Sequence, residues 1–368
     1  MHQARLQRLH GLLDRTELDA LALIPGPSLY YLTGLSFHLM ERPIIGLFPR
    51  SNEPVLFLPE LELEKAEAGP LEMKTFTYGE GPAGRVDSLK ATLKAAGLTS
   101  QSTVGVEPLE FRFSEFELLQ AAGAAEITSA SSIIRELRVI KDETEIRAME
   151  RAAEIAEAAM RATLPSIQLG MTERDLNAEL VTQLLRHGSE GELPFQPIVA
   201  SGPNSARPHA GVSNRQLAGG EFLLIDWGAR FEGYCSDITR TFALDDSDDQ
   251  MQAIYQPVLE ANQAGRERAA PGVPCGEVDQ AARLIIEAAG YGPRFIHRLG
   301  HGLGLEAHEA PYLFAENMET LEAGMAFTIE PGIYISRVGG VRIEDDVITT
   351  ETGSRTLTKL SRELQVIP

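Results

Sequence analysis

The 368-residue sequence contains little cysteine and few basic residues, and both shortages restrict what the protein can be. Its two cysteines, Cys235 and Cys275, are too few for a disulfide framework, which favours a reducing compartment such as the cytoplasm. Its 33 basic residues stand against 53 acidic ones, which gives a formal net charge of −20. Because nucleic acids and anionic membranes attract positive surfaces, this balance argues against both as general partners.

Long apolar runs are also missing from the sequence. None approaches the roughly 18 residues needed to cross a bilayer. The N-terminal residues are interrupted by Arg15, Glu17 and Asp19, so we interpret them as a helix followed by a strand and not as a signal peptide. With 43% hydrophobic residues, the chain has enough apolar material for a core. We therefore expect a cytoplasmic globular protein without a membrane segment.

The pattern of apolar residues predicts two domains of different character. Residues 1–133 alternate helix-like segments with strand-like ones such as ALALIP, IIGLFP and EPVLFLP, which is typical of an α/β domain. Residues 134–368 begin with two long helices, capped by Asp142 and Thr172, and become strand-rich after them. Two later helices are expected at 249–268 and 276–289.

A first candidate hairpin contains two aspartates in strand-like sequence, where aspartate is normally depleted. Its strands are FLLIDWGAR and YCSDITRTF, with FEG as the turn. The midpoint between Asp226 and Asp237 falls in that turn, so a simple antiparallel register places them opposite each other. Opposed carboxylates repel unless a cation lies between them, which favours a divalent metal ion. The alternative is a β-bulge that shifts the register and separates the two acids.

A second candidate hairpin repeats this arrangement. GMAFTIEPGIYI and GVRIEDDVI flank the turn SRVGG, and Glu330 and Glu344 are placed symmetrically about that turn. The period of two along a strand puts Arg342 on the same face as Glu344. Asp345 is expected to point the other way. Asp346 lies further along and is expected to support the ligands or to face solvent.

Three of the eight histidines lie between the hairpins, in FIHRLGHGLGLEAHEAP at residues 295–311. His297, His301 and His308 stand beside glycines that permit close backbone approach, and this setting favours a metal site over isolated histidines. His209, in SARPHAG, is a weaker candidate on position alone. Four carboxylates with one imidazole can hold two divalent ions that share ligands and activate a water. The predicted reaction class is metal-assisted hydrolysis.

These segments resemble the pita-bread metallopeptidases, in particular the Xaa-Pro peptidase branch of prolidase and aminopeptidase P. The resemblance is carried by DWGARFEGYCSDITRTF, HRLGHGLGLEAHEAP, IEPGIY and VRIEDDV, which agree with the family in order and spacing. It implies an α+β fold with a C-terminal pita-bread domain and a smaller N-terminal creatinase-like α/β domain. It also implies hydrolysis of the bond between an N-terminal residue and a following proline.

The resemblance implies a metal ligand at each of five positions. Asp226 would bind one ion, while Asp237 and Glu344 would bridge both. His301 and Glu330 would complete the ligands of the other ion. Two divalent ions per subunit are therefore expected, with manganese as the first choice and zinc or cobalt as alternatives.

The resemblance also implies catalytic roles and substrate contacts. Glu330 would carry a proton to the leaving proline nitrogen. His209 and His308 would hold the scissile carbonyl or stabilise the tetrahedral intermediate. Three further positions match substrate contacts or residues that support the ligands: His297, Arg342 and Tyr334. Proline-containing peptides are the expected substrates, and a homodimer is the expected assembly.

One departure from the family leaves the subtype open. Some prolidases place an arginine shortly after the histidine that corresponds to His308, where it binds the free carboxylate of the dipeptide. Here residues 299–336 contain no Lys or Arg, and Tyr312 occupies that neighbourhood. The chain could be an aminopeptidase P acting on longer peptides, or a dipeptidase with another cation. Arg42, which shares the loop LSFHLMERP with His38, is a candidate, although a polar turn is the simpler interpretation of this loop.

Other proteins with this fold provide alternatives to an Xaa-Pro peptidase. A non-catalytic peptide-binding module would keep the fold and lose the metal ligands, whereas all five positions are filled here. A methionine aminopeptidase-like enzyme would share the ligands, but usually lacks such an N-terminal domain.

Overall fold

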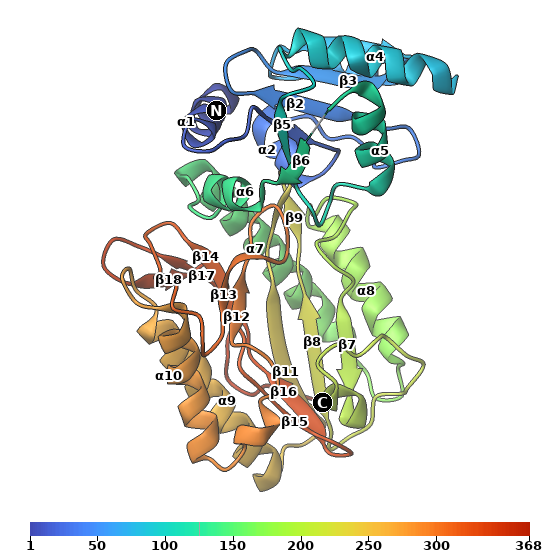
Figure 1. The fold of residues 1–368 in the computed structure, drawn as a ribbon. Coiled ribbons are helices and arrows are strands. Elements are labelled where there is room, and N and C mark those ends of the chain that lie inside the picture. Colours follow the sequence, from blue (N-terminus) through green and yellow to red (C-terminus); the bar gives the residue numbers. More distant parts are fainter. Residues whose placement is uncertain (125) are drawn as a thin grey trace. The chain divides into compact units, whose positions relative to one another are not determined.

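A computed structural model of the chain describes residues 1–124 and 126–368 and divides it into two compact units (Figure 1). Unit 1 is Met1–Arg138 and unit 2 is Val139–Pro368. The boundary expected at 133/134 for functional domains stays a prediction, because compact units need not coincide with independently folding domains.

Unit 1 is built on a six-stranded mixed sheet with the strand order β4-β3-β2-β1-β5-β6. Strands β1, β2 and β3 are buried along their whole length, which explains their continuous apolar sequences. The elements of unit 1 are α1 (His2–Leu13), β1 (Ala20–Leu23), α2 (Pro27–Thr33), β2 (Ile45–Pro49), β3 (Val55–Pro59), η1 (Glu60–Glu62), α3 (Leu63–Glu67), β4 (Lys74–Tyr78), α4 (Pro82–Ala95), β5 (Thr103–Val106), α5 (Phe113–Ala122), β6 (Glu126–Ser129) and α6 (Ser131–Arg138).

Unit 2 contains two larger sheets, β19-β11-β8-β7 and β13-β12-β14-β17-β18, and two short ribbons, β10-β9 and β15-β16. Its helices are α7 (Glu143–Thr163), η2 (Leu164–Ser166), α8 (Glu173–Arg186), η3 (Gly202–Ala206), α9 (Asp249–Arg268), α10 (Cys275–Ala288) and η4 (Gly292–Arg294). Its strands are β7 (Ile198–Ser201), β8 (Phe222–Trp227), β9 (Arg230–Phe231), β10 (Tyr234–Cys235), β11 (Ile238–Leu244), β12 (Gly300–Gly302), β13 (Glu309–Leu313), β14 (Ala326–Ile329), β15 (Gly332–Ile335), β16 (Gly339–Arg342), β17 (Asp345–Thr349), β18 (Ser354–Thr356) and β19 (Val366–Ile367).

The first sheet of unit 2 packs one face against α7 and α8. The predicted caps of these helices are confirmed, because Asp142 and Thr172 both form capping boxes. Ile225 and Trp227 of β8 belong to a buried cluster with residues of both helices. The Trp227 indole N–H donates to the carbonyl oxygen of Ala156 at 2.9 Å. Since side chains alternate along a strand, Asp226 projects to the opposite face.

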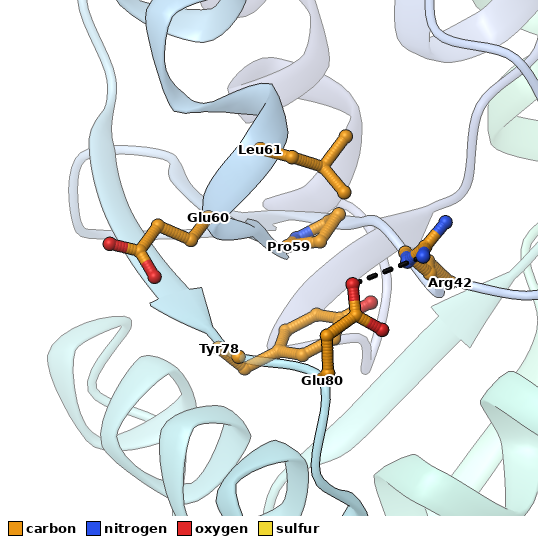
Figure 2. Close-up of a pocket in the computed structure, with 7 residues that line it drawn as sticks. Arg42, Pro59, Glu60, Leu61, Tyr78 and Glu80 are labelled. Atoms are coloured by element: carbon orange, nitrogen blue, oxygen red, sulfur yellow. Dashed lines mark hydrogen bonds and ion pairs between the residues drawn. The ribbon is translucent and has the colours of Figure 1, made fainter.

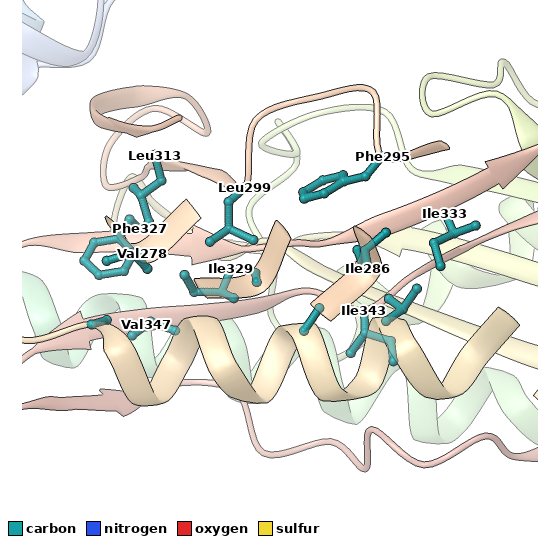
Figure 3. Close-up of a cluster of buried hydrophobic side chains, with 14 of the residues drawn as sticks. Val278, Ile286, Phe295, Leu299, Leu313, Phe327, Ile329, Ile333, Ile343 and Val347 are labelled. Atoms are coloured by element: carbon teal, nitrogen blue, oxygen red, sulfur yellow. The ribbon is translucent and has the colours of Figure 1, made fainter. Parts of the chain in front are cut away.

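In the second half of unit 2, α9 and α10 likewise pack against one face of the strands. Figure 3 shows Phe327, Ile329 and Ile343 in the buried cluster that these helices share with the strands. Glu330 and Glu344 follow apolar residues of this cluster directly, so they project away from the helices. The amphipathic strands therefore present their acidic side chains on the face that the helices do not cover.

The acidic faces of the two halves adjoin each other. An antiparallel bridge joins Thr239 to Glu344, and the Glu344 amide donates to the Thr239 carbonyl oxygen at 3.1 Å. This bridge brings both predicted hairpins to one place. No helix in the described parts of the chain combines the length and apolar character of a membrane span.

Candidate metal centre

The first hairpin corrects the expected register. Asp226 pairs with Thr239 and not with Asp237, so the simple register was wrong. The cause is the turn, which is formed by Glu232 and Gly233 with φ values of 49° and 80°. Two central residues with positive φ give the hairpin turn whose twist suits the flanking strands. Because the shift from Asp237 to Thr239 is two residues, the two aspartates still share a face.

The second hairpin has the expected register. The ladder between β14 and β17 pairs Ile329 with Asp345, which places the next residue, Glu330, opposite Glu344. The ribbon of β15 and β16 continues the same register toward the turn. Directly opposed side chains of an antiparallel pair lie on one face. The two glutamates therefore meet at the edge where the acidic faces adjoin.

Together the hairpins and the histidine segment gather the predicted ligands. In the part of the chain that the structure describes, three groups have ligand atoms within 4.8 Å of one another: Asp226 with Asp237 and Glu344, His301 with Glu330 and Glu344, and Asp237 with His301 and His308. The groups overlap, since Glu344, Asp237 and His301 each belong to two of them. Such overlap is the arrangement that shared ligands of two neighbouring ions require.

Burial makes this cluster unfavourable without a cation. It raises the pKa of Asp237 and of Glu344 well above the usual range, and the neighbouring carboxylates raise both pKa values further. Among the described residues, Oδ1 of Asp226 and Oδ1 of Asp237 are buried without a hydrogen-bond partner. Unpaired carboxylate oxygens in a mutually repelling group are what a hard divalent ion would satisfy, so these residues fit a metal centre.

The imidazole of His301 is set up as a ligand. Its Nδ1 lies 3.1 Å from the carbonyl oxygen of Gly302, which can only accept, so Nδ1 carries the proton. The lone pair is then on Nε2, which lies 3.4 Å from Oε1 of Glu330 and 3.8 Å from Oδ2 of Asp237. Burial lowers the pKa of His301 well below its usual value and keeps the ring neutral. A backbone carbonyl that fixes the tautomer is typical of metal-bound histidine.

A hydrogen-bonded chain holds one side of the cluster. Arg342 donates from Nη2 to Oδ2 of Asp226 at 2.6 Å and from Nη1 to the Tyr334 hydroxyl at 3.0 Å. His297 Nδ1 lies 2.8 Å from the Arg298 carbonyl oxygen, so its Nε2 accepts from the Tyr334 hydroxyl at 2.9 Å. Burial, reinforced by Arg342, lowers the pKa of His297 to about 3. This series of hydrogen bonds orients Asp226, and Arg342 supplies one positive charge beside it.

Thr239 and Asp346 support the ligands; Asp346 was one of the expected supports, whereas Thr239 was not identified from the sequence. The Thr239 hydroxyl donates to Oε2 of Glu344 at 2.5 Å. The carboxylate of Asp346 accepts from the Asp237 backbone N–H at 3.1 Å and is fully buried, so it does not face solvent. Strand parity could have indicated Thr239, because it shares a face with Asp237.

Asp345 points away from the cluster, as expected. It accepts from Arg240 at 2.9 Å and from Arg362 at 2.7 Å. Burial alone would raise its pKa, but these two guanidinium groups hold the pKa of Asp345 below its usual value. Arg240 also donates to the carbonyl oxygen of Glu344 at 2.6 Å. The ion pair of Arg240 with Asp345 therefore fixes the backbone next to the ligand Glu344.

The two histidines expected to contact the substrate are both exposed. The ring of His308 lies 3.8 Å from that of His301, centroid to centroid. His209 follows Pro208, whose carbonyl oxygen accepts from Arg342 at 3.2 Å. The ring of His308 thus adjoins the cluster, the backbone beside His209 is tied to Arg342, and both side chains are open to a ligand.

The remaining candidates differ in location. Tyr312 lies on β13 directly opposite His301. His38 and Arg42 belong to unit 1, where His38 is exposed. Arg42 lines a cavity of about 360 Å³ in that unit, and its guanidinium lies 3.0 Å from Glu80. Figure 2 shows this pair among the residues that line the cavity. Within unit 1 these contacts fit the interpretation of a polar turn.

The class of protein that this fold and site define is a metallopeptidase. Residues 147–351 match Metallopeptidase family M24, and residues 5–140 match the Creatinase/Prolidase N-terminal domain. The chain belongs to metallopeptidase family M24, and the expected two-domain pita-bread fold is confirmed.

Individual relatives agree with this family over nearly the whole chain. The sequence is 37% identical over 364 residues to an Xaa-Pro dipeptidase of Pyrococcus horikoshii, covering 98% of each chain. The solved structure of an Xaa-Pro dipeptidase from Bacillus anthracis has a TM-score of 0.91 at 34% identity and covers 100% of both chains. That of an X-Pro aminopeptidase from Thermotoga maritima has a TM-score of 0.87 at 32% identity, covering 98% of this chain and 99% of that one.

The cluster predicts that Glu330 lowers the stability of the metal-free protein as the pH rises toward neutrality. Burial raises the pKa of Glu330 from 4.5 to about 7. Its stabilising contribution is complete below about pH 4.5 and is lost as the pH rises through about 7. The buried histidines have lowered pKa values and act in the opposite sense while their unfolded forms lose protons around pH 6.5. The effect of Glu330 is therefore measured as a difference: the Tm of chelator-treated wild type should fall relative to that of Glu330→Gln between about pH 4.5 and 7.

Scanning calorimetry over this interval provides the measurement and its control. In metal-free Glu330→Gln the titrating group is gone, so its Tm should change with pH only through the remaining groups. Added Mn²⁺ should raise the Tm most at the upper end, since it stabilises the ionised carboxylates. A metal-free Tm that rises with pH, and does so equally in Glu330→Gln, would contradict the electrostatic account.

Proposed function

We propose that this chain is an Xaa-Pro dipeptidase, which hydrolyses the bond between an N-terminal residue and a C-terminal proline with the aid of two divalent metal ions. The observation that carries this proposal is the pair of overlapping ligand groups that share Glu344. The names of the relatives from Pyrococcus horikoshii and Bacillus anthracis support the dipeptide as substrate.

The proposed ligand assignment divides the cluster between two ions. Asp226, Asp237 and Glu344 would hold one ion. His301 and Glu330 would hold the other, together with the shared Asp237 and Glu344. When bound, the ions would polarise the scissile carbonyl and lower the pKa of a water. Manganese is proposed first, and the oxygen-rich ligand set also accommodates zinc or cobalt.

Glu330 is the proposed proton carrier. The proline nitrogen of an Xaa-Pro bond carries no hydrogen, so it must gain a proton to leave. The Glu330 carboxylate lies among the proposed ligands, so it would be placed to take a proton from the attacking water and release it to that nitrogen. The Thr328 hydroxyl, 3.4 Å from Oε1 of Glu330, helps to orient it. His209 and His308 would donate hydrogen bonds to the oxygen on which negative charge develops.

The second candidate is an aminopeptidase P acting on longer peptides. It is favoured by the X-Pro aminopeptidase from Thermotoga maritima and by Tyr312 in the place where some prolidases have arginine. A peptide-binding module and a methionine aminopeptidase-like enzyme have less support, given the complete ligand set and the Creatinase/Prolidase N-terminal domain. A homodimer and a cytoplasmic location remain predictions from the resemblance and the cysteine content.

The two subtypes predict opposite substrate preferences. The metal-loaded dipeptidase should hydrolyse Ala-Pro with a kcat/KM at least about tenfold above that for Ala-Pro-Ala, because a charged carboxylate contact is lost in the tripeptide. Steady-state kinetics with both peptides provide the measurement. A preference for the tripeptide would select aminopeptidase P instead.

The shared ligands should be more sensitive to substitution than their number suggests. Glu344→Gln and Asp237→Asn should each lower kcat/KM by more than about 100-fold and reduce the bound metal, because each side chain serves both ions. Glu351→Gln, an exposed acid beyond the same hairpin, should retain activity. Metal analysis must accompany the kinetics. Near-normal turnover of either variant with both ions still bound would refute the shared role.

A further inference from the structure

The backbone N–H groups of Glu330 and Glu344 point away from each other, although the two residues are opposed in the second hairpin. The Glu330 N–H donates to the carbonyl oxygen of Leu299 at 2.8 Å, and the Glu344 N–H donates to that of Thr239 at 3.1 Å. Opposed residues whose N–H groups face outward form a non-hydrogen-bonded pair, in which the side chains lie closest together. The separation of the two carboxylates therefore depends on the hydrogen-bonded pairs that flank them.

The flanking pair on the side of the turn is incomplete. The register places Pro331 opposite Ile343, and the Ile343 N–H lies 3.4 Å from the Pro331 carbonyl oxygen. The reciprocal bond cannot form, because proline has no N–H. The ladder between the two strands is thus weakened directly beside Glu330 and Glu344.

Asn262 of α9 supplies a donor at this place. Its side chain is fully buried, and Nδ2 donates to the carbonyl oxygen of Ile343 at 3.2 Å and to that of Ile329 at 3.1 Å. Ile343 and Ile329 directly precede Glu344 and Glu330, and both belong to the buried cluster beneath the strands (Figure 3). One amide therefore holds the backbone next to both glutamates.

The surroundings of Asn262 fix the direction of its amide. Oδ1 accepts from Nε of Arg266 at 2.7 Å, and Nδ2 also donates to Oδ2 of Asp345 at 3.0 Å. With a donor on one side and acceptors on the other, the amide has a single favourable orientation. Gly265 lies on the same face of α9, where an added Cβ would be 3.0 Å from Cγ2 of Ile329. The helix is therefore close enough for a short side chain to reach the backbone of the strands.

We propose that Asn262 is a positioning residue of the metal centre, whose amide takes the place of the N–H that Pro331 lacks and fixes the separation of Glu330 and Glu344. This inference rests on the ligand assignment in the proposed function and not on the choice of substrate. Without the amide, the repulsion between the carboxylates would be opposed by a weakened ladder. The glutamates would then move apart, and the affinity for the ions would fall.

Titration of chelator-treated protein with Mn²⁺, followed by calorimetry, tests this role. Asn262→Ala should raise the Kd for Mn²⁺ about 10-fold, the lower end of the effect expected when a group that orients a ligand is removed. Asn262→Leu leaves no cavity, should show the same loss, and replaces Asn262→Ala if that variant does not fold. The Tm of each metal-free variant reports its stability.

Tyr255→Phe is the matched control. Tyr255 is a buried residue of the same helix, and its hydroxyl donates to the Arg362 carbonyl oxygen at 2.6 Å. The variant loses a hydrogen bond from α9 to the backbone at a place away from the two glutamates. It should lower the metal-free Tm and bind Mn²⁺ as wild type does.

Pro331→Ala provides a rescue that packing alone does not predict. Alanine restores an N–H at position 331, which can complete the pair with Ile343. Combined with Asn262→Ala, it should recover most of the lost Mn²⁺ affinity, although the volume of the Asn262 side chain is still missing.

Two outcomes would overturn the assignment. An unchanged Kd in folded Asn262→Ala, with a Tm lowered as in Tyr255→Phe, would leave Asn262 with a stabilising role only. A double variant that binds Mn²⁺ no better than Asn262→Ala would show that the missing donor does not cause the loss. The titration is independent of turnover: if wild type hydrolyses neither Ala-Pro nor Ala-Pro-Ala, the proposed function fails, while the Kd values still decide the role of Asn262.

Discussion

The mutual repulsion of four buried carboxylates is the constraint on which the rest of the structure depends. Asp226, Asp237, Glu330 and Glu344 project from two hairpins to one place, and Arg342 compensates only part of their charge. In a medium of low dielectric constant such a group either takes up protons or binds cations. The raised pKa values and the unpaired carboxylate oxygens are two expressions of the same imbalance.

The fold supplies the forces that hold these groups together. The strands of the two hairpins that carry the acidic ligands also carry apolar residues on their other face, and those residues pack against α7 and α8 or against α9 and α10. Burial of these apolar side chains against the helices therefore stabilises the fold and offsets the repulsion among the carboxylates on the other face. The bridge from Thr239 to Glu344 aligns the two halves, and the ion pair of Arg240 with Asp345 holds the backbone behind them. The side chains of His209 and His308 are exposed and accessible to a peptide.

The alternation of strands made much of this site predictable from the sequence. Which face each acid occupies depends on parity alone, so Asp226 and Asp237 were brought together although their register was wrong by two residues. The register itself depended on Glu232 taking a positive φ, for which its sequence gives little signal. The contact of Thr239 with Glu344 could not be identified because the two residues are neighbours only across the bridge between the two halves. Cross-strand contacts of this kind become visible only once the strands are paired.

The central claim is that the carboxylate cluster holds two ions through shared ligands. Electron paramagnetic resonance of chelator-treated protein reloaded with Mn²⁺, combined with metal analysis, tests it most directly. Shared carboxylates hold two ions about 3.5–4 Å apart, so the account predicts two Mn²⁺ per chain and the spectrum of a spin-coupled pair. One ion per chain, or two ions with the spectrum of isolated Mn²⁺, would contradict it.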